Sequence, residues 1–329
     1  MIWSGKFDAP VNNVLKTSSH IAFVCGDGFV RFVSDNLGYS EVKAHQAAIL
    51  SSAELPGGKL LTGGDDGKVA LCCAPGEVEI ISKHEGAWIN SVATAANGAF
   101  AWAAGKMVYY RSPSGAIRVV ESPTTPAALA FDPRGRRVAI GLYGSVWVWL
   151  PKEKENLVRR LEWKGSHIGV TWSPDGCYII TSMQECELHG WRLKDAANLQ
   201  MAGYPGKIHS LSWDSKGQSL ATSGAPTAIV WPFDGDGPMS RAPSELGFLR
   251  AGLRIVKWRP CYDILAMGCA KGAVHLVRAS NYALQQVRIE GDGAVTGIEW
   301  SRGGEAIAIG TETGKVEIYS LEKDKNHVA

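Results

Sequence analysis

The sequence lacks an excess of charge of either sign and lacks any long apolar run. Thirty-four Lys and Arg are balanced by 32 Asp and Glu, and no run of five or more basic residues occurs that could follow a phosphate backbone. No window approaches about 18 uninterrupted apolar residues, and the N-terminal segment Met1–Asp8 lacks the apolar stretch of a signal peptide. We therefore expect a cytoplasmic protein that binds neither nucleic acid nor membrane.

Metal-binding and catalytic signatures are also absent from the sequence. The seven cysteines form no C-x-x-C pair, which favours reduced thiols packed as small apolar groups over disulfides or a zinc site. The patterns G-x-S-x-G, H-E-x-x-H and G-x-x-x-x-G-K-[ST] do not occur. We expect no catalytic residue, no metal and no cofactor, although a metal site assembled from distant residues would escape a linear scan.

Glycine is abundant, and some of the 38 glycines are periodic. In six places a turn glycine follows a strand-end residue by four positions, and one further pair has the same spacing without glycine. These pairs are Glu54/Gly58, Thr94/Gly98, Phe131/Gly135, Trp172/Gly176, Trp213/Gly217, Trp300/Gly304 and, without glycine, Trp258/Tyr262. An apolar run, a second hairpin and another apolar strand follow each pair, which indicates a repeated unit.

The ends of the later apolar strands give the period of this unit. They are Val33, Cys72, Tyr110, Trp149, Trp191, Trp231, Val277 and Tyr319, separated by 39, 38, 39, 42, 40, 46 and 42 residues. The mean of about 41 residues is the period of a four-stranded propeller blade. The longest gap contains an irregular stretch, Asp234–Ser244, which we expect to be a surface loop between the third and fourth strands of unit six.

Short segments of these units resemble the Trp-Asp (WD) repeat family of β-propellers. The best matches are 171–176 (TWSPDG), 62–69 (TGGDDGKV) and 310–319 (GTETGKVEIY), and the resemblance covers nearly the whole chain. It implies an all-β propeller of four-stranded blades, for which we predict eight blades, with seven as the alternative. No unit keeps the terminal Trp-Asp pair, so the repeats are divergent.

The resemblance also implies roles for particular residues. His45 and His84 are similar to the histidine of the family's Gly-His step, and His45 would join Thr62 and either Asp65 or Asp66 in a structural hydrogen-bond network. Cys72 stands where the tryptophan of that network would be. The tryptophans at equivalent strand ends are expected to pack between blades; they are Trp172, Trp213, Trp258 and Trp300.

The two ends of the chain are expected to complete one blade together. Glu322–His327 is a poor strand, so the eighth unit lacks its outermost strand. The leading segment Met1–Phe7 can supply it, which would remove an unpaired interface between the first and last blades. We therefore predict a single closed domain of residues 1–329.

Candidate binding residues come from the register of the repeats with the family. Loops that join blades surround the mouth of the channel, and this places Trp88, His167, Lys207 and Arg254 on that face. An exposed Trp88 would be a rigid anchor for a partner, and Lys207 with Arg254 would meet a carboxylate. Alternatively, Trp88 covers the edge of its own blade and the two cations are only solvated.

The function that fits this pattern is a monomeric, non-enzymatic scaffold or adaptor that binds a protein or peptide partner through the loop face. The fold alone supports only this general statement. The alternative is a metal or small-ligand site in the central channel, including a propeller enzyme similar to the quinoprotein class.

Overall fold

The protein is all-β, as the sequence predicts. The computed structural model describes residues 1–153 and 155–321, and these contain thirty-one strands and no helix. Consequently no helix in these residues has the length and apolarity needed to cross a membrane. The segment Glu322–His327, which we expected to be a poor strand, lies outside the described residues.

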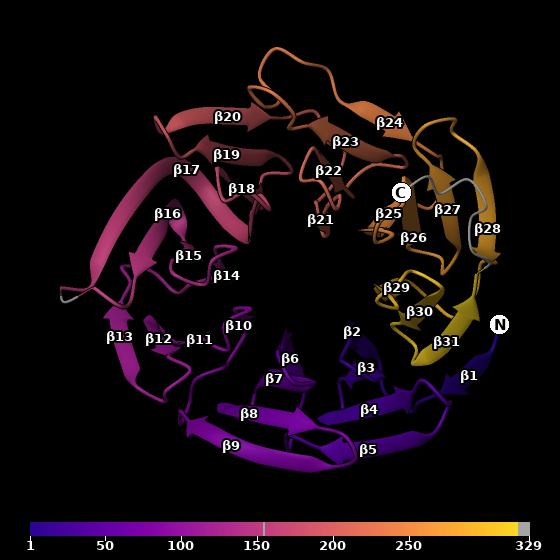
Figure 1. The fold of residues 1–329 in the computed structure, drawn as a ribbon, viewed down its shortest axis with the longest axis horizontal. Coiled ribbons are helices and arrows are strands. Elements are labelled where there is room, and N and C mark those ends of the chain that lie inside the picture. Colours follow the sequence, from indigo (N-terminus) through magenta and orange to yellow (C-terminus); the bar gives the residue numbers. More distant parts are fainter. Residues whose placement is uncertain (154, 322–329) are drawn as a thin grey trace.

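The strands form antiparallel sheets set side by side around one axis in a propeller-like arrangement (Figure 1). Six sheets have four strands and one has seven. Five of the four-stranded sheets are continuous in sequence. They are β2 (Val11–Lys16), β3 (His20–Cys25), β4 (Phe29–Ser34), β5 (Tyr39–Lys43); β6 (Ile49–Leu55), β7 (Lys59–Gly64), β8 (Lys68–Cys73), β9 (Glu77–Lys83); β10 (Ser91–Thr94), β11 (Phe100–Ala104), β12 (Met107–Arg111), β13 (Ile117–Glu121); β21 (Leu211–Trp213), β22 (Ser219–Thr222), β23 (Ala228–Pro232), β24 (Ser244–Leu246); and β25 (Leu253–Trp258), β26 (Ile264–Cys269), β27 (Val274–Arg278), β28 (Leu284–Arg288).

The seven-stranded sheet exists because one long strand is shared between two halves. It runs β14 (Ala128–Phe131), β15 (Val138–Gly141), β16 (Tyr143–Leu150), β17 (Leu157–Trp172), β18 (Tyr178–Met183), β19 (Leu188–Arg192) and β20 (Ala197–Met201). Residues Leu157–Ser166 of β17 pair with β16, and residues His167–Trp172 pair with β18. The sheet is therefore two four-stranded units that have β17 in common.

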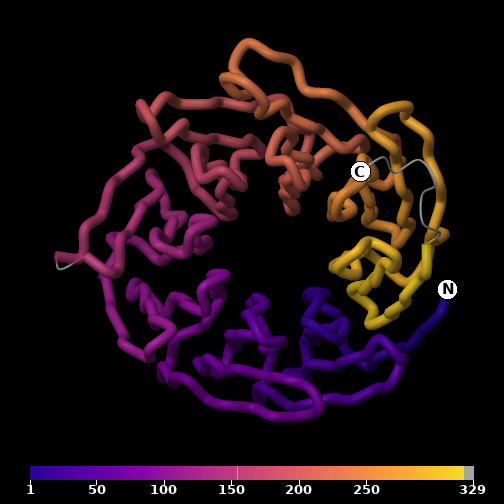
Figure 2. Tube along the Cα trace, in the orientation of Figure 1, coloured from indigo at the N-terminus to yellow at the C-terminus, as the bar shows by residue number. Residues whose placement is uncertain are grey.

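The last sheet combines both ends of the described chain. It consists of β29 (Val295–Trp300), β30 (Ala306–Thr311), β31 (Lys315–Ser320) and β1 (Trp3–Lys6). Trp3 lies opposite Ile318 in the β1–β31 pair. The side chains of Phe7 and Phe23 share one buried cluster with Ile318, so this core joins the first sheet to the last. Figure 2 shows the indigo N-terminal segment beside the yellow C-terminal strands.

The residues that mark the sequence repeat occupy equivalent strands. Val33, Cys72, Tyr110, Trp149, Trp191, Trp231, Val277 and Tyr319 lie in β4, β8, β12, β16, β19, β23, β27 and β31. The irregular stretch from Asp234 lies between β23 and β24, as we predicted. The spacing in sequence therefore corresponds to the spacing of the four-stranded units.

The periodic glycines have a local conformational cause. Gly58, Gly98, Gly135, Gly176, Gly217 and Gly304 all have φ angles between 62° and 85°. This left-handed region carries a steric penalty for residues that have a Cβ. In the unit that has Tyr262 in place of glycine, the preceding Cys261 takes the left-handed conformation, with φ 62°.

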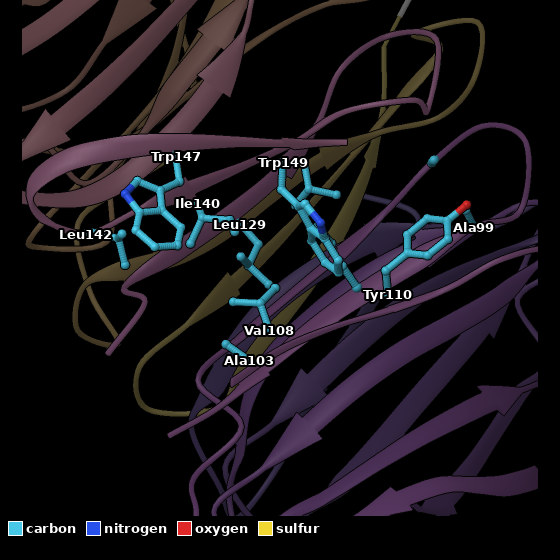
Figure 3. Close-up of a cluster of buried hydrophobic side chains, with 13 residues drawn as sticks. Ala99, Ala103, Val108, Tyr110, Leu129, Ile140, Leu142, Trp147 and Trp149 are labelled. Carbon is cyan, nitrogen blue, oxygen red and sulfur yellow. The ribbon is translucent and has the colours of Figure 1, made fainter. Parts of the chain in front are cut away.

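Apolar side chains between neighbouring sheets form the core. Figure 3 shows one such cluster, in which Val108 and Tyr110 of β12 meet Leu129 of β14 and Trp149 of β16. All four side chains are buried. Because each sheet covers the apolar face of the next, the core follows the ring of sheets instead of filling one central volume.

The strand-end tryptophans pack between sheets, which confirms their predicted role. The indole Nε1 of Trp172 donates to the carbonyl oxygen of Ala130 at 3.1 Å, and that of Trp300 donates to Lys257 at 3.2 Å. Both acceptors lie on the innermost strand of the preceding unit. These two tryptophans thus bury their rings and satisfy their donors in one contact each.

We predict that Trp300→Ala destabilises the protein strongly. Trp300 is 2% exposed, and truncating such a ring costs about 3–5 kcal/mol of unfolding free energy. Urea unfolding followed by circular dichroism measures the effect. The matched control is Trp88→Ala, which removes a ring that is 71% exposed and is expected to change stability by less than about 0.5 kcal/mol. Equal stability of the two variants would contradict the packing role.

Candidate functional site

One face of the molecule carries the connections between sheets. On this face, connections between sheets lie beside turns between the second and third strands. The amide of Ala44 donates to the Gly28 carbonyl oxygen at 2.9 Å, and the amide of Gly206 donates to that of Gly224 at 3.1 Å. A Cβ at Gly28 would collide with the carbonyl oxygen of His45, so this turn requires glycine. We call this surface the loop face.

Trp88 is the most exposed tryptophan on the loop face. It lies in the connection between β9 and β10 and is 71% exposed. Its neighbour Ile89 is fully buried, and the Ile89 amide donates to the Gly64 carbonyl oxygen at 3.1 Å. The hydroxyl of Ser51 also donates to the Ile89 carbonyl oxygen, at 2.8 Å. Because Ile89 holds the backbone, Trp88 is an exposed ring on an anchored segment. The alternative, that it covers the edge of its own sheet, does not fit this exposure.

His167 does not lie on the accessible surface, and our prediction that a partner can contact it is corrected. Its side chain is completely buried in β17. Nδ1 lies 2.9 Å from the Thr181 hydroxyl and Nε2 lies 3.2 Å from the Trp163 carbonyl oxygen. Since both ring nitrogens are engaged inside the sheet, His167 is a structural residue that ties β17 to β18.

A second buried histidine lies next to this one. His189 stacks on Trp163 with ring centroids 3.8 Å apart, and its Nε2 lies 3.0 Å from Oδ1 of Asn198. Burial and, to a smaller extent, the nearby His167 outweigh the opposing effect of Asn198 and lower the pKa of His189 to about 4. Burial also lowers the pKa of His167. The imidazole of His167, in β17, and that of His189, in β19 of the same sheet, are therefore both expected to be neutral near pH 7.

Lys207 and Arg254 lie close together in the structure. They line a pocket of about 280 Å³ between the β20–β21 and β24–β25 connections. His209, which we did not predict, lines the same pocket, and its Nε2 accepts a hydrogen bond of 3.0 Å from Arg254. Its remaining lining is made of small or apolar residues, with no Asp or Glu. The arrangement is a basic pocket, a name we use for the surface around Lys207, His209 and Arg254.

The walls of the basic pocket are tied together by hydrogen bonds of two serine side chains and of the backbone. The hydroxyl oxygen of Ser223 accepts hydrogen bonds from the amides of His209 and Ser210, both at 3.0 Å. Ser210 in turn donates its hydroxyl to the Val256 carbonyl oxygen at 3.0 Å. The amide of Leu253 donates to the Ala225 carbonyl oxygen at 2.9 Å. These bonds connect three loops of two neighbouring sheets, so the pocket is preformed.

The charges of the pocket act on His209. Burial lowers its pKa, and the positive charges of Arg254 and Lys207 lower it further. The neutral imidazole is the form that can accept the Arg254 hydrogen bond. His209 therefore positions the guanidinium of Arg254.

Trp88 lies apart from the basic pocket. Its neighbouring strands β9 and β10 are on a different part of the ring from β20, β21, β24 and β25, which flank the pocket (Figure 1). The four predicted residues thus separate into an exposed anchor, a pocket pair and a buried structural histidine. In the described part of the chain, no hydrogen bond or ion pair joins a side chain of the pocket to Trp88.

The histidine network implied by the family resemblance is confirmed, with Asp66 as its acid. Nδ1 of His45 lies 2.9 Å from Oδ1 of Asp66, and Nε2 lies 2.9 Å from the Thr62 hydroxyl. Burial opposes ionisation of Asp66, but hydrogen bonds from His45 and from two backbone amides outweigh it and lower the pKa of Asp66 to about 2. Cys72 lies 3.7 Å from the Thr62 hydroxyl, where it closes this network.

The central part of the ring offers a second, chemically different surface. A pocket of about 340 Å³ is lined by the innermost strands of several sheets and contains uncharged polar side chains, among them Asn12, Asn13, Ser51 and Asn90. No group of three His, Cys, Asp or Glu side chains able to hold a metal ion occurs in residues 1–153 and 155–321.

Comparison with known proteins gives two findings. A family model described as the anaphase-promoting complex subunit 4 WD40 domain matches residues 256–328. Among solved structures, the computationally designed Ika8 protein is similar, with a TM-score of 0.78, 14% sequence identity, and coverage of 96% of this chain and 98% of that chain. At this identity the likeness concerns the fold alone. No curated protein matches the sequence.

We predict that stability falls between pH 6.5 and pH 5 because of His189. The folded-state pKa of about 4 lies below the ordinary value of 6.5. The neutral ring therefore stabilises the fold above pH 6.5, and this stabilisation is lost as the pH falls toward 4. Between pH 6.5 and pH 5 the unfolding free energy is expected to fall by about 2 kcal/mol. Urea unfolding at several pH values measures it.

The comparison variant is His189→Gln, which cannot be protonated. The unfolding free energy of this variant is expected to depend less steeply on pH across the same interval. Identical slopes for the variant and the unmodified protein would show that the buried imidazole is not held neutral.

Proposed function

We propose that this chain is a WD-repeat β-propeller with divergent repeats, and that it is a non-enzymatic scaffold that binds a protein or peptide partner through the loop face. The single observation that carries the proposal is Trp88, a 71% exposed ring on a backbone fixed by the buried Ile89. Aromatic rings held rigidly in this way supply much of the binding energy at protein interfaces.

The proposal includes a ring of eight blades within one domain of residues 1–329. It is supported by the eight equivalent marker strands and by β17, which pairs with β16 through one half and with β18 through the other. In this interpretation β17 is the outermost strand of one blade and the innermost strand of the next. Pairing of β1 with β31 would complete the eighth blade and close the ring.

The nature of the partner follows from the loop face. The basic pocket supplies Lys207 and Arg254 on the same face as Trp88, so a partner with an apolar segment and an acidic group matches it. We further propose a cytoplasmic monomer that binds neither nucleic acid nor membrane. The nearly balanced charge of the chain supports this part of the proposal.

A neutral small ligand in the central pocket is the second candidate function. The observation that favours it is the polar but uncharged lining that includes Asn12, Ser51 and Asn90. Amide and hydroxyl groups of this kind fix the orientation of neutral polar molecules. Catalysis is not part of either proposal.

We predict that Trp88→Ala and Lys207→Glu each remove the same protein partner. Affinity purification from the source cell with the intact chain, followed by mass spectrometry, identifies the partner, and the two variants are then compared. The expected loss from Trp88→Ala is at least about tenfold in affinity, the effect of a contact that contributes 1.4 kcal/mol or more.

The matched control is Tyr282→Ala. Tyr282 is 62% exposed and lies in the β27–β28 turn, on the opposite face of the ring. This variant is expected to retain the partner. Retention of the partner by both loop-face variants would refute the proposed interface.

A further inference from the structure

We propose that the basic pocket is a carboxylate-binding site, and that it takes an acidic side chain or a C-terminal carboxylate of a protein. The identification of the carboxylate as part of a protein rests on the proposed function. The binding chemistry rests on the pocket alone. The pocket gathers residues from three loops and one further turn of two neighbouring sheets.

The charges of the pocket are not balanced by the protein. Lys207 and Arg254 form no ion pair with any acidic side chain in the described part of the chain, and no carboxylate lines the pocket. Other cations are placed differently: Arg288, for example, is buried against Glu317 at 2.6 Å. Two positive charges that share a pocket repel each other. An anion bound between them is attracted by both, and this attraction offsets the repulsion.

The hydrogen bond between Arg254 and His209 prepares the guanidinium for a planar anion. One N–H of Arg254 is directed to Nε2 of His209 at 3.0 Å, which restricts the rotation of the side chain. A guanidinium has five N–H donors, so donors remain for a carboxylate, which it can bind through two parallel hydrogen bonds. His209 is thus a positioning residue, and Arg254 and Lys207 are the binding groups.

The backbone around the pocket leaves space for such a group. Gly206, Gly224, Ala225, Ala251 and Gly252 line it with little or no side chain. The φ of Gly224 is 101°, and a Cβ there would lie 2.9 Å from the Ile208 side chain. The loops that carry these residues are fixed by the Ser223 and Ser210 hydrogen bonds. Binding would therefore require little ordering of the protein.

A carboxylate fits the pocket better than a nucleic-acid phosphate chain. The pocket offers two positive charges, because the histidine that accepts from Arg254 is neutral. Tracking a phosphate backbone requires a stripe of many cations, whereas the sequence has no run of five or more basic residues and the pocket lining holds only two cations besides His209. A single carboxylate is neutralised by two cations without a longer charged surface.

The test follows the imidazole of His209 by NMR in the full-length protein during titration with acetate. Acetate is expected to shift the His209 ring signals and to raise the pKa of His209, because an anion in the pocket offsets the two cations. By linkage, a rise of one pKa unit means an acetate affinity about tenfold higher below that pKa than above it. Arg254→Gln and Lys207→Gln are each expected to reduce the affinity at least about tenfold.

Control variants and further probes separate the possible outcomes. Lys106→Gln removes an exposed cation from the β11–β12 turn, outside this pocket, and is expected to leave acetate binding unchanged. His209→Gln keeps a hydrogen-bond acceptor for Arg254 and is expected to retain acetate binding without the pH dependence. Two peptides, one amidated with internal glutamates and one uncharged with a free C-terminus, distinguish the source of the carboxylate.

The proposal is overturned if acetate leaves the His209 signals unchanged, if the Arg254 variant binds as well as the unmodified protein, or if inorganic phosphate binds at least tenfold more tightly than acetate. These results are independent of the Trp88 experiment. If Trp88→Ala loses the partner and the unmodified protein does not bind acetate, the scaffold proposal is supported and the carboxylate site is refuted. Acetate binding with an unaffected partner would sustain the site and refute the interface.

Discussion

The fold depends on apolar contact between neighbouring sheets. Each four-stranded unit has buried side chains that only the next unit covers, and a unit standing alone would leave them in water. The strand-end tryptophans reinforce this contact, because Trp172 and Trp300 place their rings between sheets and donate their indole N–H to the preceding unit. The first and last sheets face the same requirement, and the cluster of Phe7, Phe23 and Ile318 meets it at the junction of the two chain ends.

The exposed side chains of the loop face lie outside this core. The glycine turns and the His45–Asp66 network hold the connections in place, while Trp88 and the cations of the basic pocket contribute little to the core. Two exposed features with different chemistry therefore sit on a rigid frame. A frame of this kind can present an apolar anchor and an anion site to one extended partner without rearranging.

Much of the fold could be predicted from the sequence, because residues close together in the chain are enough to identify the repeat. Turn glycines, alternating strands and the period of the apolar strand ends identify the four-stranded unit. The shared strand β17 could not be predicted in this way, since its continuity across two units depends on the absence of a loop after Gly165. Linear spacing shows where strands recur but not whether the chain turns between them.

The candidate site was less predictable. Register placed Lys207 and Arg254 on the loop face correctly, but the same register placed His167 there, and the structure buries it. The reason is that β17 passes directly into the next unit, so the position that is a loop elsewhere is a paired strand residue here. His209 was missed because a histidine beside a strand start has no distinctive pattern. Only its contact with Arg254, 45 residues away, reveals its role.

In the proposed ring, the N-terminal strand β1 closes the circle of sheets by pairing with β31. Hydrogen exchange measured by mass spectrometry on the intact chain and on a chain lacking residues 1–6 tests this closure most directly. Removal of β1 is expected to make the amides of β31 and of the adjoining first sheet exchange much faster, while the sheet of β10–β13 stays protected. Unchanged protection of β31 in the shortened chain would contradict the closure.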